Sequence, residues 1–208
     1  MTGREVIVLA SASPRRREIC ELLGLHFEVI PAHGEPLPDA ALPIEKAVLR
    51  VARAKAEEVA AACPGRIVVG ADTVVEAAGR ILGKPADAED ARRMLRLLQG
   101  RIHRVLTGVW VCAPMGCDGF TEAAQVEFYP MDEADIDDYL ATGEPMDKAG
   151  AYGIQGRGMR YVRGIHGDFY TVMGLPGARL LRFLSGLAEH PRRIPGEGTA
   201  SRGQLCGN

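Results

Sequence analysis

The chain has 208 residues, of which 47% are hydrophobic and 25% are charged, and its formal net charge at pH 7 is −2. This length and composition are those of one soluble globular unit that builds a core without disulfide or metal staples. The slightly negative charge excludes a protein that holds nucleic acid through a general positive field, so any anion site must be local.

The first predicted elements alternate between strand and helix. Residues 6–9, 27–30 and 67–69 are short apolar runs typical of strands. One helix is expected to begin at Pro14 with Ser13 as its cap, and a second covers residues 44–62, where Pro64 and Gly65 stop it. The alternation indicates an α/β fold.

The middle of the chain predicts longer strands. Residues 74–82 read as a strand that turns through residues 77–79 into a second one, and residues 88–98 as an amphipathic helix ended by Gly100. Residues 103–112 and 120–129 are expected to form a hairpin. Asp132 can cap a helix that runs to Leu140.

The last third contains a candidate binding loop. Residues 146–158 lack periodicity but hold four glycines and several polar side chains. Strands are predicted at residues 161–165 and 170–173, and a helix at residues 177–187. Proline, glycine, arginine and serine dominate from Ala188 onward, which predicts one domain over residues 1–187 and a disordered tail over residues 188–208.

The five cysteines form no Cys-x-x-Cys pair and have no histidine at zinc spacing, which predicts reduced thiols in a cytoplasmic protein. Cys112 and Cys117 flank a predicted hairpin tip, so the turn alone explains their proximity. The apolar run at residues 6–12 is too short for a signal peptide, and no run is long enough to span a membrane.

Residues 9–17 read Leu-Ala-Ser-Ala-Ser-Pro-Arg-Arg-Arg, a strand end that breaks into hydroxyls and guanidiniums. The free N–H groups of the helix start, its dipole and Arg15 or Arg16 would converge on one phosphate-sized volume. The alternative is a capped surface helix with a solvated basic turn.

Asp72 follows the apolar run and Gly70-Ala71, so its carboxylate is expected at the carboxyl end of a strand, where α/β proteins commonly place ligands. A buried structural aspartate is the alternative. Residues 79–85 are not a phosphate-binding P-loop, because their glycine spacing is one residue short and Pro85 replaces the required Ser or Thr. Lys84 can still reach a phosphate, whereas Lys55 on the helix over residues 44–62 is by default a solvated residue.

Several ordered motifs together resemble the Maf family of nucleoside triphosphate pyrophosphatases, which is related in fold to inosine triphosphatase. They are Leu-Ala-Ser-Ala-Ser-Pro-Arg-Arg from Leu9, Gly-Ala-Asp-Thr-Val-Val from Gly70, Gly-Lys-Pro from Gly83, Asp-Lys-Ala-Gly-Ala-Tyr-Gly-Ile-Gln-Gly from Asp147 and Gly-Leu-Pro from Gly174. The resemblance runs from Leu9 to about Leu184. It implies a mixed twisted sheet flanked by helices, with two lobes around a cleft, and a homodimer.

By this resemblance Asp72 matches the proton acceptor of the family, and Lys55 and Lys84 match its phosphate-handling lysines. Glu35 matches an acidic metal-site residue that would hold Mg²⁺ or Mn²⁺ together with Asp72. The positions that mark the dTTP- and UTP-cleaving subfamily are Arg15, Thr73 and Gln155.

The implied reaction is hydrolysis of the α–β phosphoanhydride of dTTP or UTP, with a house-cleaning role toward modified pyrimidine nucleotides. A metal would polarise the phosphate and acidify the attacking water. The Gln155 amide can pair with the imide edge of uracil or thymine. The residues expected to bind substrate are Ser11, Ser13, Arg15, Arg16, Lys55, Thr73, Lys84 and Gln155.

Two other functions compete with this one. The same anion pocket could serve a non-catalytic, nucleotide-binding regulator of cell division, because the family takes its name from inhibition of septum formation. A nucleic-acid-binding module built on residues 15–17 conflicts with the net charge and the lack of interleaved aromatic residues. Neither nucleic acid nor a membrane is therefore an expected partner.

Overall fold

A computed structural model of the chain describes residues 5–34, 36–39 and 41–189. One seven-stranded sheet has the order β2-β1-β3-β5-β6-β7, and β4 pairs with β3 beside this path. The strands are β1 (Ile7–Leu9), β2 (Phe27–Val29), β3 (Val68–Ala77), β4 (Arg80–Leu82), β5 (Ile102–Ala113), β6 (Gly116–Phe128) and β7 (Val162–His166).

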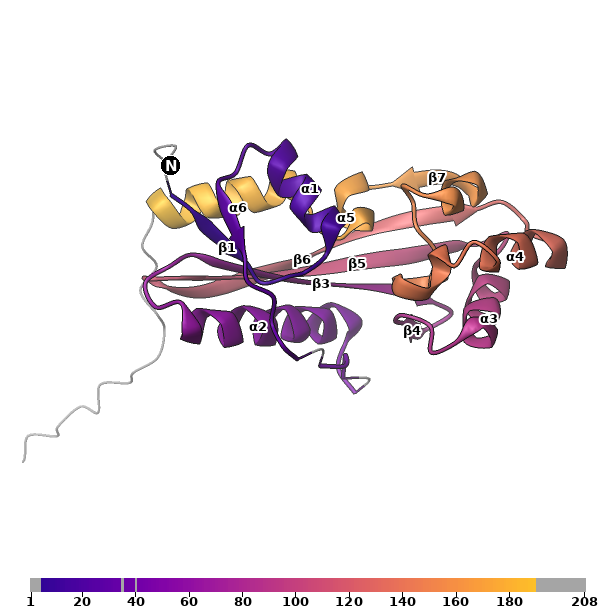
Figure 1. Cartoon of the computed structure of the whole chain (residues 1–208), viewed down its shortest axis with the longest axis horizontal. Helices are drawn as coiled ribbons and strands as arrows, with labels where there is room; N and C mark the ends of the chain where they lie inside the picture. Colours follow the sequence, from indigo (N-terminus) through magenta and orange to yellow (C-terminus); the bar gives the residue numbers. More distant parts are fainter. Residues whose placement is uncertain (1–4, 35, 40, 190–208) are drawn as a thin grey trace, which may run out of the picture.

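Helices cover both faces of this sheet (Figure 1). The helices α1 (Pro14–Leu22), α5 (Phe169–Met173) and α6 (Gly177–Glu189) lie on one face, and α2 (Ile44–Ala62) lies on the other. The helices α3 (Ala88–Leu98) and α4 (Glu133–Leu140) pack at the far end. Because β1 is parallel to β2 and β3 while the other pairs are antiparallel, the predicted mixed, helix-flanked sheet is confirmed.

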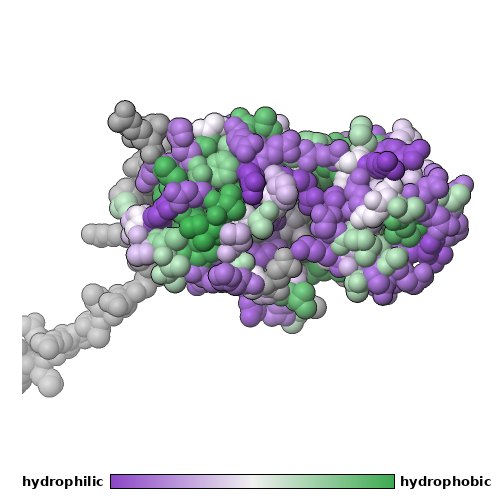
Figure 2. All heavy atoms as spheres, viewed as in Figure 1, coloured by the Kyte–Doolittle hydropathy of each residue, from purple (hydrophilic) through white to green (hydrophobic). Residues whose placement is uncertain are grey.

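The core consists of two large clusters of buried side chains that share the long strands. One cluster joins α1 and α6 to residues such as Leu9, Val69 and Val109 of the sheet. The other joins α3 and α4 to residues such as Val75 and Val105. Both β3 and β5 therefore pass from one cluster into the other. Figure 2 shows a largely hydrophilic surface on the viewed face, with apolar side chains gathered toward the end that holds β1.

Two predictions about the strands are wrong. The strand expected at residues 67–69 does not end before Asp72, because β3 pairs with β5 continuously from Val68 to Glu76. Asp72 therefore lies in the middle of a strand. The strand expected at residues 170–173 is the helix α5, which Asp168 caps by accepting a hydrogen bond from the Thr171 N–H at 2.7 Å.

The predicted hairpin is confirmed as β5 and β6, whose strands extend to a turn of only two residues between Ala113 and Gly116. The predicted helices at residues 44–62 and 88–98 are confirmed. The last helix continues to Glu189, and the rest of the predicted tail, residues 190–208, lies outside the described residues. Among the described helices, none is both long and apolar enough to cross a membrane.

Candidate functional site

The candidate site is a gap along one edge of β3. On this edge β1 pairs with Val68 and Val69, and β4 pairs with residues 75–77. No strand of the described chain pairs with residues 70–74 on this side, whereas β5 covers the opposite edge throughout. The middle of β3, which carries Asp72 and Thr73, therefore borders a break between β1 and β4.

The topology explains why the break lies there. From β1 the chain passes through α1 to β2, and from β2 it passes through α2 on the opposite face to β3. The carboxyl end of β1 is thus a point where the connections diverge to opposite faces, which is where open α/β sheets bind ligands. The turn after β1 holds the predicted anion-binding residues.

On the α2 face, Lys55 and Asp72 form a close ion pair. Lys55 Nζ donates to Asp72 Oδ1 at 2.7 Å, and the two side chains are 13% and 16% exposed. A Cβ atom at Gly70 would lie 2.5 Å from the Ala52 carbonyl oxygen, and one at Gly108 would lie 2.8 Å from the backbone of α2. These two glycines therefore let α2 approach closely enough for Lys55 to reach Asp72.

On the opposite face, Arg16 ties three segments together. Its guanidinium donates to Gly174 O at 2.9 Å, to Ser11 Oγ at 2.9 Å and to Thr73 Oγ1 at 3.2 Å. Thr73 Oγ1 also lies 3.0 Å from Thr107 Oγ1. Arg16 and Thr73, both expected to bind substrate, thus bind each other and fix the turn after β1 against β3. Because neighbouring residues of a strand face opposite ways, Asp72 and Thr73 reach the gap from different faces.

The start of α1 is built differently from the prediction. Ser13 is the N-cap residue, but its side chain makes no capping hydrogen bond. Instead, Ser11 Oγ accepts the Ser13 N–H at 3.3 Å. Arg15 Nε donates to Met173 O at 3.3 Å.

Burial alone would raise the pKa of Asp147, but its hydrogen bond to Lys148 and the charges of Lys148 and Arg15 hold that pKa below its ordinary value.

The glycine-rich loop is ordered by one carboxylate. Glu144 Oε1 accepts the Tyr139 O–H at 2.8 Å and the Gly158 N–H at 3.2 Å, while Glu144 Oε2 accepts the Arg157 N–H at 2.7 Å. Tyr139 Oη in turn accepts the Gly153 N–H at 3.0 Å. The loop folds as three short 3-10 helices, Glu144–Asp147, Ala149–Ala151 and Arg157–Tyr161.

Gln155 extends from this loop to α1. Its Nε2 donates to both carboxylate oxygens of Glu18, at 3.3 and 3.2 Å. A flipped amide would place Oε1 against that carboxylate, so electrostatics select the orientation in which the donors face Glu18 and Oε1 faces away. The three-residue spacing puts Glu18 on the same side of α1 as Arg15. The predicted base-reading residue is thus connected to the helix whose start carries the predicted anion-binding turn.

The remaining predicted residues border the gap less directly. Leu82 pairs with Val75, so the antiparallel register leads the chain after β4 back toward the level of Thr73. Lys84 lies in this segment, which is held by a hydrogen bond from the Gly150 N–H to Gly83 O at 3.0 Å. Glu35 lies outside the described residues.

Four important residues escaped the sequence analysis. Thr107 and Thr171 are buried polar residues, and Thr107 Oγ1 donates to Thr171 O at 2.7 Å. Thr107 could have been noticed in the sequence, because it is a threonine inside the apolar run of β5. Glu18 and Glu144 carried no signal beyond their charge, because their partners lie 137 and 5 to 14 positions away.

Several known proteins are similar to this chain. The family described as "Maf-like protein" matches residues 6–187. A dTTP/UTP pyrophosphatase of Geobacillus sp. is 48% identical over 85% of this chain and 95% of the relative. A dTTP/UTP pyrophosphatase of Koribacter versatilis is 47% identical over 86% of this chain and 92% of the relative. The Ham1 protein structure of Staphylococcus aureus aligns with a TM-score of 0.47 and 14% identity, over 88% of this chain and 99% of that one.

Proposed function

The chain belongs to the Maf family, and we propose that it is a nucleoside triphosphate pyrophosphatase that cleaves dTTP and UTP between the α- and β-phosphates. The products are the nucleoside monophosphate and pyrophosphate. Relatives that carry this activity in their names are 45–48% identical and align over most of their length. The structural observation that carries the proposal is the gap beside Asp72, which has the Lys55–Asp72 ion pair on one face and the turn held by Arg16 on the other.

The triphosphate is proposed to lie across this gap. Its charge needs neutralisation more than covalent chemistry, so positioned cations and N–H groups supply most of the catalysis. The first N–H groups of α1 and the positive end of its dipole favour a phosphate. Ser11, Ser13, Arg15 and Lys84 are the proposed side-chain contacts. Arg16 is assigned a supporting role in this proposal, because it holds the turn through Ser11 Oγ.

Asp72 is the proposed acceptor of the water proton. Lys55 bonds to one oxygen of its carboxylate and so fixes the orientation of the group. The other oxygen can take a hydrogen bond from a water that attacks the α-phosphate. The Lys55 ammonium also balances phosphate charge next to the reacting bond. Hydrolysis by this route needs no serine or cysteine nucleophile.

A divalent cation, Mg²⁺ or Mn²⁺, is proposed to arrive with the nucleotide. The described residues contain no cluster of three or more side chains able to hold a metal. A site with few protein ligands fits Mg²⁺, which commonly binds one or two carboxylates together with substrate phosphates. Asp72, and Glu35 outside the described residues, are the proposed protein ligands. When bound, the cation would act as a Lewis acid on the phosphate.

Base selection is proposed to come from the orientation of Gln155. Because Glu18 occupies the amide donors, Gln155 Oε1 is left to accept the N3–H of a uracil or thymine imide. Cytosine has no proton on N3 and cannot make this contact. The resemblance to the family further supports a homodimer in the cytoplasm.

Incubation of the purified full chain with UTP and Mg²⁺, followed by chromatography of the nucleotides and an assay for pyrophosphate, tests the proposal. UMP and pyrophosphate in equal amounts are expected, and addition of EDTA should abolish turnover. UDP with free phosphate would contradict cleavage at the α–β bond. Binding of UTP without turnover would favour a nucleotide-sensing regulator.

A further inference from the structure

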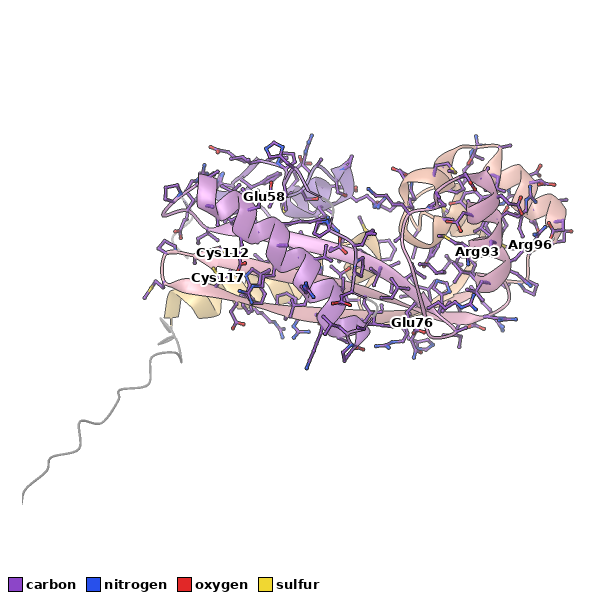
Figure 3. All side chains as sticks on the ribbon, turned by 90° about the horizontal axis from the view of Figure 1, so that it is seen from below. Glu58, Glu76, Arg93, Arg96, Cys112 and Cys117 are labelled. Atoms are coloured by element: carbon purple, nitrogen blue, oxygen red, sulfur yellow. The ribbon has the colours of Figure 1, made fainter. Side chains whose placement is uncertain are left out.

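Two cysteines face each other across the β5–β6 hairpin, far along the sheet from α3 and α4 (Figure 3). Cys112 on β5 is the direct register partner of Cys117 on β6. Their neighbours Ala113 and Gly116 are the pair that closes the two-residue turn. In such a hairpin the closing pair is hydrogen-bonded, so the next pair along the ladder is the non-hydrogen-bonded one.

The backbone at this pair suits a disulfide. The Cα atoms of a non-hydrogen-bonded pair lie about 4.5 Å apart and the side chains project to the same face. This distance lies within the range of about 4.4–6.8 Å found between the Cα atoms of disulfide-bonded cysteines. Each thiol is therefore presented to the other by the hairpin itself, and closing the bond requires no rearrangement of the strands.

The two thiols differ in environment. Cys112 is buried with Val68 and Ala56, whereas Cys117 is exposed. Burial, followed by a hydrogen bond with Cys117, raises the pKa of the Cys112 thiol to about 12. The thiolate is the nucleophile in disulfide exchange, so the raised pKa makes Cys112 the less reactive of the two thiols. The exposed Cys117 therefore reacts first with an incoming molecule, and Cys112 then resolves the adduct.

We propose that Cys112 and Cys117 form a reversible dithiol–disulfide site that reacts with small-molecule disulfides such as glutathione disulfide. The Cys117 thiolate attacks one sulfur of glutathione disulfide, which forms a mixed disulfide and releases one glutathione. The Cys112 sulfur then gives up its proton to solvent and attacks the Cys117 sulfur, which releases the second glutathione. The protein loses two hydrogens in total, and the two glutathione molecules gain them. This site is independent of nucleotide hydrolysis.

Two other described cysteines, Cys63 and Cys20, are the alternative partners for a disulfide. Cys63, at the end of α2, packs against the same cluster as Cys112 and is therefore a competing partner. Cys20 is buried in the cluster formed by α1 and α6. Neither occupies a cross-strand position opposite another cysteine.

The chain offers a clean mass-spectrometric test. Trypsin cuts after Arg104 and Lys148, so Cys112 and Cys117 share the peptide of residues 105–148, whereas Cys63 lies in residues 56–66. The reduced full chain is treated with glutathione disulfide, alkylated and digested without reductant. The expected result is a peptide of residues 105–148 that lacks both alkyl groups and is about 2 Da lighter than its reduced form. Dithiothreitol should restore alkylation.

Variants and fluorescence separate the outcomes. Cys117→Ser removes the exposed thiol without touching the core and should abolish the change, whereas the matched control Cys63→Ser should retain it. Trp110 is the single tryptophan and lies on the same face of β5 as Cys112, so its emission should fall on oxidation and recover on reduction. A peptide that stays fully alkylated, keeps glutathione or is linked to residues 56–66 would overturn the proposal.

Discussion

Replacing Gly70 by alanine tests whether the spacing between α2 and the sheet controls the Lys55–Asp72 ion pair and, through it, the proposed activity. The added Cβ would lie 2.5 Å from Ala52 O and 2.7 Å from Ala56 N, both backbone atoms of α2. Ordinary contact begins near 3.4 Å, so the helix must withdraw by about 0.9 Å. The distance from Lys55 Nζ to Asp72 Oδ1, now 2.7 Å, would then grow beyond hydrogen-bond range.

The expected effects follow from this displacement. Overpacking of a core costs about 1–3 kcal/mol, which lowers the Tm of a chain of this length by about 2–4 °C for each kcal/mol. A misplacement of about 1 Å can reduce turnover about 10²-fold. We expect kcat/KM with UTP to fall by that order. Gly164→Ala is the matched control, because a Cβ at this strand glycine would meet nothing within 4 Å.

The test is to measure kcat/KM with UTP and the Tm of both variants. A link between the position of α2 and turnover is refuted if Gly70→Ala lowers the Tm but leaves kcat/KM unchanged, because α2 would then have moved without consequence for Lys55. It is also refuted if Gly164→Ala reduces kcat/KM as much as Gly70→Ala does.

Three further predictions concern single side chains. Asp72→Asn should reduce turnover of UTP at least ~10²-fold with an unchanged circular dichroism spectrum; near-normal activity would exclude its role as proton acceptor. Glu18→Gln should free the Gln155 amide to flip, so the ratio of kcat/KM for UTP over CTP should fall roughly ten-fold, whereas Glu21→Gln on the same helix should keep that ratio. Burial lowers the pKa of His103 to about 4, so between pH 6.5 and 4 this side chain binds a proton in the unfolded chain but not in the folded one. As the pH falls through that window, the free energy of unfolding should therefore decrease by about 1.4 kcal/mol per pH unit. A denaturation series in which His103→Gln keeps the wild-type slope would contradict this.

Local chemistry explains which elements could be predicted from the sequence. The helix over residues 44–62 has a regular apolar face and a proline–glycine stop, and its predicted bounds match α2. Asp132 was expected to cap a helix, and it forms a reciprocal capping box with Asp135. In such cases a few neighbouring residues determine the structure, so pattern and position suffice.

The predictions that failed concern elements whose structure depends on contacts between residues far apart in the sequence. The helix α5 has only five residues, of which Val172 and Thr171 favour strands, and it forms because Asp168 caps it and Thr171 O accepts the Thr107 hydroxyl. Gly70 looked like a strand end, yet its missing side chain serves the approach of α2 and the strand continues.

The candidate site divides in the same way. Motif order identified the segments that border the gap, and the structure brings Ser11, Arg16 and Thr73 into direct contact. Sequence reasoning assigned Arg16 to a phosphate, because nothing local reveals that its guanidinium reaches Gly174, 158 positions away. The pairing of Gln155 with Glu18 is equally non-local.

The long strands that run through both buried clusters constrain how the molecule can move. A hinge between two halves normally lies in a few loop residues, but here β3, β5 and β6 connect the halves as a hydrogen-bonded ribbon. Rotation of one half would bend all three strands together. Closure around a nucleotide is therefore expected from the short segments at the rim of the gap, so Asp72 and Thr73 on β3 should keep their spacing while the proposed substrate enters and its products leave.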